Sequence, residues 1–346
     1  MAEILELTDL HKVFPGRTKR SASVHAVQGV SLSIGPGRTF GLVGETGCGK
    51  STIARLSLGL LEPSRGTVRV CDRDLSTLRR NELREMRAEM QMVFQDPYAS
   101  LNPRRTIRQS LHAAFEVHGQ SGGAIRTIVD ELAETVGLSR AQLERYPRGL
   151  SGGQRQRAGI ARALALEPKL IVCDEPVSAL DVSIQAQILN LLRDLQSKSD
   201  LTFLFISHDL RVVRHMADEI GVMYLGHMVE VGSADVVYRS PAHPYTRALL
   251  SAVPDQDEGG EGTGSRIMLT GDVPSPLSPP TGCPFHTRCQ RAREIAGDLS
   301  EVPAQCRSEM PPVQTLPSGA KVACWFPEGE AETPEKKQVK PREVPR

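Results

Sequence analysis

The sequence predicts an α/β fold in which a mostly parallel β-sheet is covered by helices on both faces. Three observations predict it. Apolar runs at 170–173 and 203–206 are continuous rather than alternating, each is followed by a segment of helical periodicity, and a glycine-rich loop at 44–49 separates another apolar run from a helix. Strands buried on both faces are apolar throughout, and helices join parallel strands.

The first 40 residues are expected to form an antiparallel β subdomain. ILELTDLHKVF at 4–14 and HAVQGVSLSI at 25–34 alternate between apolar and polar residues, with glycine and proline between the runs. Alternation of this kind is typical of strands that bury only one face.

The next segments supply the parallel sheet and a helical subdomain. RTFGLVGETGCGKSTIARLSLGLL at 38–61 passes from an apolar strand through the glycine loop into an amphipathic helix. Helical periodicity dominates 77–92 and 105–165, and PKLIVCDEP at 168–176 and LTFLFISHD at 201–209 are two further buried strands.

The composition changes near residue 253. PDQDEGGEGTGS at 254–265 is polar and glycine-rich, and SPLSPP at 275–280 is proline-rich, which marks a domain boundary. We therefore expect one domain over 1–255 and a small, loop-rich, cysteine-containing extension over 256–330. The charged, proline-containing end at 331–346 is expected to be a disordered tail.

Bulk composition excludes several classes of protein. The net charge of +1 gives no electrostatic reason for a nucleic-acid partner. No apolar run is long enough to cross a bilayer, and the start MAEILELTDL is no signal peptide. The protein is thus expected to be cytosolic, or to reach a membrane only through partners.

The motif GETGCGKS at 44–51 matches the phosphate-binding pattern G-x-x-x-x-G-K-S. Its glycines let backbone N–H groups surround phosphates, and the following helix directs its positive end toward them. Lys50 is expected to reach the β- and γ-phosphates, and the Ser51 hydroxyl to ligate Mg²⁺. A strand, this loop and a helix in succession predict a RecA-like P-loop NTPase core.

Polar residues follow the two later strands at their carboxyl ends, where such sheets bind ligands. Asp174 is a candidate for holding Mg²⁺ through water, and Glu175 for polarising the attacking water as a general base. His208 follows the next strand and is a candidate to donate a hydrogen bond to the γ-phosphate. Two solvated turn acids and an incidental histidine are the alternative interpretation of these residues alone.

LSGGQRQR at 150–157 places four glycine or polar residues, Ser151 to Gln154, just before a helix. Backbone N–H groups at a helix start bind anions. The chain therefore carries a second loop suited to phosphate besides the one at 44–51.

These motifs together resemble an ATP-binding cassette (ABC) ATPase. GETGCGKST, Gln95 in FQD, LSGGQ, LIVCDEP, SALD and ISHD occur in the family's order, and the resemblance covers about residues 3–255. It implies that Phe14 stacks on adenine, that Gln95 contacts Mg²⁺ or water and senses the membrane partner, and that His208 is the switch histidine. The implied nucleotide site comprises Phe14, Gly44, Glu45, Thr46, Gly47, Cys48, Gly49, Lys50, Ser51, Thr52, Gln95, Asp174, Ser151, Gly152, Gly153, Gln154 and Asp181. The implied catalytic residues are Glu175, His208, Gln95 and Lys50, and the implied Mg²⁺ ligands are Ser51, Gln95 and Asp174.

The resemblance also implies a dimer. In the family, the signature loop (here Ser151 to Gln154) binds the γ-phosphate held by the opposite subunit, and Asp181 ends the loop that crosses between subunits. Two cassettes therefore enclose two ATP, and hydrolysis releases the clamp. Soluble ABC ATPases of DNA repair or translation generally carry two cassettes or long coiled-coil insertions, so a transporter's energy subunit is the favoured interpretation.

Less universal stretches resemble the oligopeptide/dipeptide (and nickel) importer cassettes, most closely the second ATPase of a peptide importer. They are FQDPYASLNPRR at 94–105, CDEPVSALDVSIQAQILNLL at 173–192, SPAHPYTRALLSAVP at 240–254 and PSPLSPPTGCPFHTRC at 274–289. The implied partners are a second and different cassette chain, two membrane permeases and an extracytoplasmic solute-binding protein, at the cytoplasmic face of a bacterial membrane. Peptides, nickel chelates and some sugars remain open as the solute.

Cys283, Cys289, Cys306 and Cys324 crowd the end of the chain. Four thiolates in a loop-rich segment are suited to an iron–sulfur cluster, such as [4Fe-4S], or to zinc. The importer family has a similar region, but this chain has Ala296 where the family's third cysteine falls, and Cys306 would have to replace it through a longer loop. Unliganded cysteines are the alternative, and His286 is a spare candidate ligand.

Overall fold

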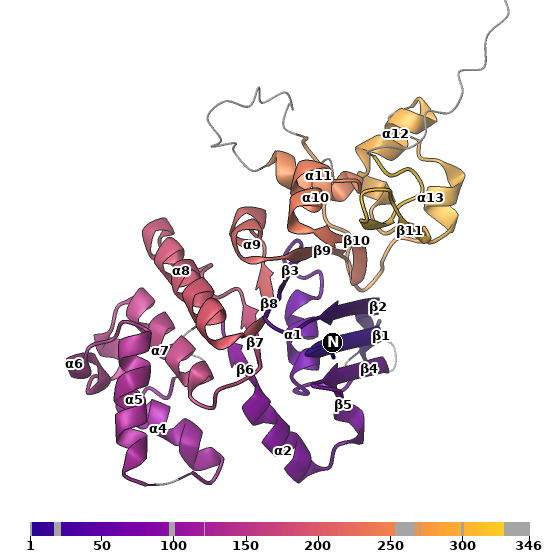
Figure 1. Cartoon of the computed structure of the whole chain (residues 1–346). Coiled ribbons are helices and arrows are strands. Elements are labelled where there is room, and N and C mark those ends of the chain that lie inside the picture. The colour runs from indigo at the N-terminus through magenta and orange to yellow at the C-terminus, as the bar shows by residue number, and fades with distance from the viewer. Residues whose placement is uncertain are drawn as a thin grey trace, which may run out of the picture.

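A long mixed β-sheet runs through the centre of the computed structural model (Figure 1). The structure describes residues 2–16, 22–96, 101–120, 122–252, 267–269, 271–298 and 301–328. Within them the sheet has eight strands in the order β11-β12-β10-β9-β3-β8-β7-β6. Its strands are β3 (Thr39–Val43), β6 (Met90–Val93), β7 (Leu170–Asp174), β8 (Thr202–Ser207), β9 (Glu219–Tyr224), β10 (His227–Ser233), β11 (Val313–Thr315) and β12 (Lys321–Ala323).

The strands from β9 to β6 are parallel, as the continuous apolar runs predict. β3 pairs in parallel with β8 and β9, and β7 pairs in parallel with β6 and β8. β10 is antiparallel to β9, and β12 is antiparallel to β10. The carboxyl ends of β6, β7 and β8 therefore lie at one edge of the sheet.

A second sheet is antiparallel and contains β2-β1-β4-β5. It consists of β1 (Leu5–Phe14), β2 (Val24–Ile34), β4 (Arg65–Val70) and β5 (Arg73–Asp74). Leu5 pairs with Ile34 and Val70, so three buried side chains of neighbouring strands share a face. This is the antiparallel β subdomain that the alternating pattern predicts.

Helices cover both faces of the large sheet and form a separate group beside it (Figure 1). That group contains α4 (Ile107–Val117), α5 (Ala124–Thr135), α6 (Arg140–Leu143) and α7 (Gly152–Leu164). The other helices are α1 (Lys50–Ser57), α2 (Arg80–Glu89), α8 (Val182–Ser199), α9 (Leu210–Met216), α10 (Ala234–Arg239), α11 (Pro244–Ser251), α12 (Gln290–Ala296) and α13 (Ala304–Ser308). Short 3-10 turns occur at η1 (Leu75–Thr77), η2 (Pro147–Gly149) and η3 (His286–Arg288).

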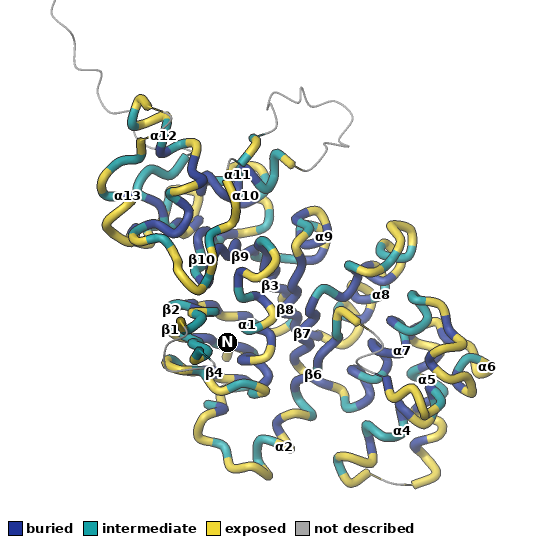
Figure 2. The backbone as a smooth tube through the Cα atoms, turned by 180° about the vertical axis from the view of Figure 1, so that it is seen from behind, coloured by how far each residue is buried: buried dark blue, intermediate teal, exposed yellow. Residues whose placement is uncertain are grey.

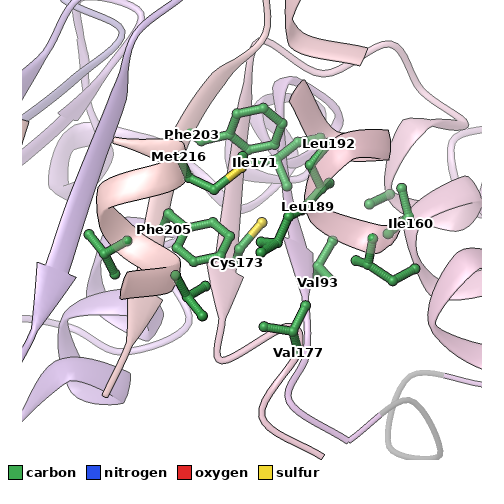
Figure 3. Packing of buried hydrophobic residues seen from close by; sticks show 14 of the residues in the cluster. Val93, Ile160, Ile171, Cys173, Val177, Leu189, Leu192, Phe203, Phe205 and Met216 are labelled. Carbon is green, nitrogen blue, oxygen red and sulfur yellow. The ribbon is translucent and has the colours of Figure 1, made fainter. Parts of the chain in front are cut away.

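Alternate residues of the central strands belong to two different cores. Phe203 and Phe205 of β8 face the cluster that contains α8, whereas Leu204 and Ile206 face the cluster that contains α1. Figure 3 shows Phe203, Phe205 and Cys173 packed beside Leu189 and Leu192. Because both faces are buried, residues 170–173 of β7 and 203–206 of β8 are all apolar, which is why their sequence pattern is continuous.

The C-terminal extension packs on the edge of the same sheet beside α10 and α11 (Figure 1). Its β12 pairs with β10, and its buried Phe285 contacts Tyr224 at 5.2 Å and Tyr245 at 5.3 Å between ring centroids. Aromatic pairs of this kind contribute about 0.5–1.5 kcal/mol beyond their burial. Figure 2 shows buried backbone segments running from the core into the extension.

A buried carboxylate holds the turn before α11, next to which the extension packs. Glu230 of β10 is fully buried, and its two oxygens accept the backbone N–H groups of Ala242 at 2.8 Å and His243 at 2.9 Å. Burial raises the pKa of Glu230, and these hydrogen bonds oppose the rise. The two bonds fix the turn that leads into α11.

The predicted fold class is confirmed: a P-loop NTPase core, an antiparallel β subdomain, a helical subdomain and a cysteine-containing extension are all present. None of the helices in the described residues is long and apolar enough to cross a membrane. The polar stretch at 253–266, residues 97–100 of the quoted stretch 94–105, and the predicted disordered tail at 331–346 lie outside the described residues.

Candidate nucleotide site

The phosphate loop connects β3 to α1 and owes its shape to its glycines. Gly47 and Gly49 have φ angles of +83° and +112°, in the left-handed region that favours glycine. A Cβ on Gly49 would lie 2.1 Å from the carbonyl oxygen of Ala26, and one on Gly44 would lie 2.2 Å from that of Met223. Only glycine therefore fits at both positions.

Lys50 begins α1 and is only 5% exposed. Its Nζ donates hydrogen bonds to the carbonyl oxygens of Gly44 at 2.7 Å and Glu45 at 3.1 Å. The ammonium group is thus held inside the curve of the loop, where its charge is available to an anion bound there.

Ser51 and Asp174 meet across the gap between α1 and β7. The Ser51 hydroxyl donates to Oδ1 of Asp174 at 3.1 Å, and Asp174 is 7% exposed. Burial raises the pKa of the Asp174 carboxyl, although the Ser51 hydrogen bond opposes the rise. A divalent cation is the ligand that offsets the cost of ionising a buried carboxylate beside a hydroxyl, so this pair fits the predicted Mg²⁺ site.

Glu175, Gln95 and His208 come together at the carboxyl ends of β6, β7 and β8. Gln95 Nε2 donates to Oε2 of Glu175 at 3.2 Å, and Nδ1 of His208 lies 3.3 Å from the same oxygen. Glu175 has a φ angle of +49°, which is strained for a residue with a side chain. The sequence placed Glu175 and His208 after separate strands. It did not predict the strand before Gln95, because residues 90–92 of β6 lie in the stretch 77–92 that was expected to be helical. The parallel register brings the three residues to one point.

A cavity of about 370 Å³ lies over the phosphate loop. Phe14, at the end of β1, lines it, as a residue that stacks on adenine must. The cavity is lined by Phe14, Val24, His25, Ala26, Thr46, Gly47, Gly49, Lys50, Ser51, Thr52, Gln95, Glu175, Leu225, Gly226 and Pro276. Val24, His25, Ala26, Leu225 and Gly226 were not predicted, and neither was Pro276, which comes from the proline-rich stretch of the extension.

The signature loop forms the start of α7. Ser151 Oγ accepts the backbone N–H of Gln154 at 3.3 Å, and the Ser151 N–H donates to the Gln154 side chain at 3.0 Å, so the two residues cap the helix reciprocally. A Cβ on Gly153 would lie 2.6 Å from Cγ2 of Ile184. The structure describes all four residues of Ser151 to Gln154, and none of them lines the cavity over the phosphate loop.

Asp181 precedes α8 and is exposed, and its backbone carbonyl accepts the N–H of Ile184 at 2.9 Å. The next residue, Val182, is 82% exposed.

Two side chains that the sequence did not predict hold the phosphate loop from outside. Tyr245 Oη accepts the backbone N–H of Glu45 at 2.9 Å. Arg288, from the extension, donates to the Glu45 carboxylate at 2.9 Å. No local pattern marked either residue, since their contacts depend on how α11 and the extension pack on the core.

The four C-terminal cysteines are all buried and free. Burial and, to a smaller extent, the nearby thiols of Cys283, Cys289 and Cys306 raise the pKa of Cys324 to about 12, so the four sulfurs share one region. Among the described residues, however, no three or more His, Cys, Asp or Glu side chains are grouped so as to hold a metal ion. The four residues are of a type that suits a cluster, but the described residues do not form the four-ligand arrangement that the sequence predicts.

Two family models match the chain. One, described as ABC transporter, covers residues 27–178, and the other, described as oligopeptide/dipeptide transporter, C-terminal region, covers residues 229–295. Together they cover the phosphate loop, the signature loop and the extension as far as Ile295.

Several curated proteins are similar over nearly the whole chain. The oligopeptide transport ATP-binding protein AppF of Bacillus subtilis is 48% identical over 327 residues, which is 93% of this chain and 96% of that protein. The oligopeptide transport ATP-binding protein OppF of Salmonella typhimurium is 49% identical over 294 residues, covering 83% and 88%. The di/tripeptide transport ATP-binding protein DppF of Pseudomonas aeruginosa is 45% identical over 324 residues, covering 93% and 96%.

Solved structures of ATP-binding cassettes share the fold. A dimeric structure of the cassette MJ0796, bound to ADP and Pi after hydrolysis, has a TM-score of 0.60 and 28% identity, and covers 66% of this chain and 98% of that one. The structure of cbiO1 from Clostridium perfringens has a TM-score of 0.61 and 26% identity, covering 69% and 92%.

Identity near 48% over more than nine tenths of both chains, together with a formed phosphate loop and a Glu175 site at the sheet edge, leaves one family. The chain belongs to the ABC transporter family and is an ATP-binding subunit, an ATPase coupled to transport, of the oligopeptide/dipeptide transporter group.

Proposed function

We propose that this chain is the ATP-hydrolysing subunit of a bacterial importer whose solutes are oligopeptides or dipeptides. The observation that carries the proposal is the similarity to peptide transport proteins over the extension as well as the cassette. Import of a nickel chelate or a sugar is the alternative, because the cassette itself does not touch the solute.

In the proposed mechanism, the glycine loop at 44–49 and Lys50 bind the phosphates of ATP, and Phe14 stacks on the adenine. Mg²⁺ would be held by Ser51, Asp174 and Gln95, and would neutralise charge that develops on the phosphates. The contacts of Ser51 with Asp174 and of Gln95 with Glu175 support this assignment.

Glu175 is proposed to accept the proton of the attacking water. Its position within 3.3 Å of both Gln95 and His208 supports this role, because a general base must be oriented toward its water. The side chain of His208 is half-exposed, so it is free to donate a hydrogen bond to a γ-phosphate.

The second half of each ATP site is proposed to come from another cassette. Ser151 to Gln154 do not line this chain's cavity, which supports binding of a phosphate that a second chain holds. Asp181 and exposed Val182 are proposed to lie in the same interface. The second cassette is proposed to be a different chain, as in importers with paired ATPases.

The remaining proposed partners are two membrane permeases and an extracytoplasmic solute-binding protein, with this chain at the cytoplasmic face of the membrane. The proposed domain limits are 1–255 for the ATPase, 256–330 for the extension and 331–346 for the tail. No nucleic acid is proposed as a partner, since the net charge is +1.

Reconstitution of the complete transporter in proteoliposomes tests the solute. We expect the rate of MgATP hydrolysis to rise when a di- to pentapeptide and the solute-binding protein are present, with uptake of the labelled peptide. A nickel chelate and an oligosaccharide of similar size are the controls. Stimulation by either control, with none by peptides, would contradict the proposed solute.

A cysteine-based metal site in the extension is proposed as a second feature. Its support is that Cys283, Cys289, Cys306 and Cys324 share one buried region. In anaerobically purified protein we expect a broad visible absorption from an iron–sulfur cluster that is lost in the Cys324→Ser variant. The Cys71→Ser variant, altered in a half-buried cysteine of the cassette, is the control. Colourless protein without bound iron would contradict the cluster.

A further inference from the structure

We propose that Arg288 of the C-terminal extension is a positioning residue for the phosphate loop, through which the extension sets the affinity of the chain for ATP. The inference rests on the proposed function only in that the loop at 44–51 binds ATP. It adds Arg288 to that site. Arg288 lies outside the cassette, 243 positions along the chain from Glu45, the loop residue that it contacts.

Arg288 makes a largely buried ion pair with the phosphate loop. Its Nη1 lies 2.9 Å from Oε2 and 3.2 Å from Oε1 of Glu45, and 3.4 Å from the hydroxyl of Tyr224. The side chains of Arg288 and Glu45 are 9% and 24% exposed. Loss of one partner from such a pair leaves an uncompensated buried charge, which distinguishes it from a surface ion pair.

Glu45 connects Arg288 to the residue that binds phosphate. The carboxylate of Glu45 is turned toward the extension and does not line the nucleotide cavity. Its backbone N–H donates to Tyr245 at 2.9 Å, and its backbone carbonyl accepts from Lys50 Nζ at 3.1 Å. A shift of Glu45 therefore moves the oxygen to which Lys50 is bonded.

The charges of Glu45 and Arg288 predict the direction in which Arg288 changes the affinity for ATP. A carboxylate within the phosphate loop repels an incoming triphosphate, and in a poorly solvated site such repulsion is strong. Arg288 neutralises this carboxylate and draws it away from the cavity. Without Arg288, the charge of Glu45 opposes ATP binding.

Arg288 is itself held by the packing of the extension. It ends η3, between Phe285 and Cys289, and Phe285 is 1% exposed against Tyr224 and Tyr245. Because these neighbours fix η3, the position of Arg288 depends on how the extension is packed. A displacement of the cysteine-containing segment is thereby transmitted to the phosphate loop.

Titration of the full-length chain with MgATP tests the proposal. We expect the Kd of Arg288→Gln to be about tenfold higher than that of the unchanged chain, within the usual range of coupling between sites. Arg288→Lys, which keeps the charge, is expected to stay within about threefold. Arg291→Gln, which removes an arginine that pairs with Glu294 inside the extension, is the matched control and should bind ATP normally.

The double variant Glu45→Gln with Arg288→Gln separates a charge effect from damage to the fold. With Gln at 45, loss of Arg288 is expected to leave the Kd unchanged relative to Glu45→Gln alone. A tenfold loss that persists in this background, or an unchanged Kd for Arg288→Gln, overturns the proposal. Since the measurement is nucleotide affinity and not peptide uptake, the inference can fail while the proposed function stands.

Discussion

Replacing Glu175 by Gln is expected to lower the rate of ATP hydrolysis at least about hundredfold while leaving ATP binding intact. Removal of a general base usually costs 10²–10⁴-fold. The amide has the same shape as the carboxylate and can keep the contacts with Gln95 and His208, both within 3.3 Å, but it cannot accept the proton of the water. Phosphate release by the complete transporter measures the rate, and titration with MgATP measures the binding.

The matched control for this variant is Glu116→Gln. Glu116 is an exposed glutamate of α4 whose Oε1 lies 3.2 Å from Nδ1 of His112, far along the chain from Glu175. The Glu116→Gln variant is expected to hydrolyse ATP at the rate of the unchanged chain. Retained turnover in Glu175→Gln would show that another group activates the water and would remove Glu175 from the mechanism.

Replacing Ser151 by Ala is expected to lower turnover at least about tenfold without weakening the ATP affinity of the isolated chain. The hydroxyl of Ser151 is proposed to contact the γ-phosphate held by the second cassette, and removal of one such donor usually costs more than tenfold. Because Ser151 does not line its own chain's cavity, the nucleotide bound by Lys50 loses no contact. Phosphate release by the transporter and MgATP titration of the single chain separate the two effects.

Replacing Ser151 also removes the cap of α7, and the effect of that loss on turnover needs its own control. Ser151 and Thr106 both cap a helix with a reciprocal glutamine three residues later, and each cap is worth about 1 kcal/mol. Thr106→Ala therefore removes a comparable cap from α4 without touching the signature loop. Equal losses of turnover in the two variants would mean that Ser151 acts only as a cap.

Much of the site follows from the sequence because its residues sit at the ends of regular elements. Glu175 and His208 each come shortly after a predicted strand, and strands that are parallel neighbours end at one edge. Gln95 follows β6, whose residues 90–92 were expected to be helical, so only the family resemblance pointed to it. The glycines of the phosphate loop likewise follow from local geometry, since a Cβ at Gly49 would meet the backbone of β2. Pattern and spacing are sufficient for such contacts.

The contacts of the extension could not be predicted in the same way. Arg288 and Glu45 are 243 residues apart, and β12 has three residues, too few to show a period. Pro276 belongs to a proline-rich stretch whose composition indicates a loop but not where the loop lies. These contacts depend on how the extension packs against β10 and α11, which no local pattern encodes.

The cysteines show the limit of spacing as evidence. The crowding of Cys283, Cys289, Cys306 and Cys324 predicted that they meet, and their thiols do influence one another's pKa. Coordination geometry depends on side-chain orientation within a few tenths of an ångström. Spacing alone does not set that orientation.

This chain is proposed to supply half of each of two ATP sites. Native mass spectrometry of the Glu175→Gln chain, alone and mixed with the second cassette of its transporter, tests this arrangement. With MgATP, one of these samples is expected to give a species of two cassettes and two ATP that is absent with MgADP. A single cassette with one nucleotide under every condition would contradict the claim.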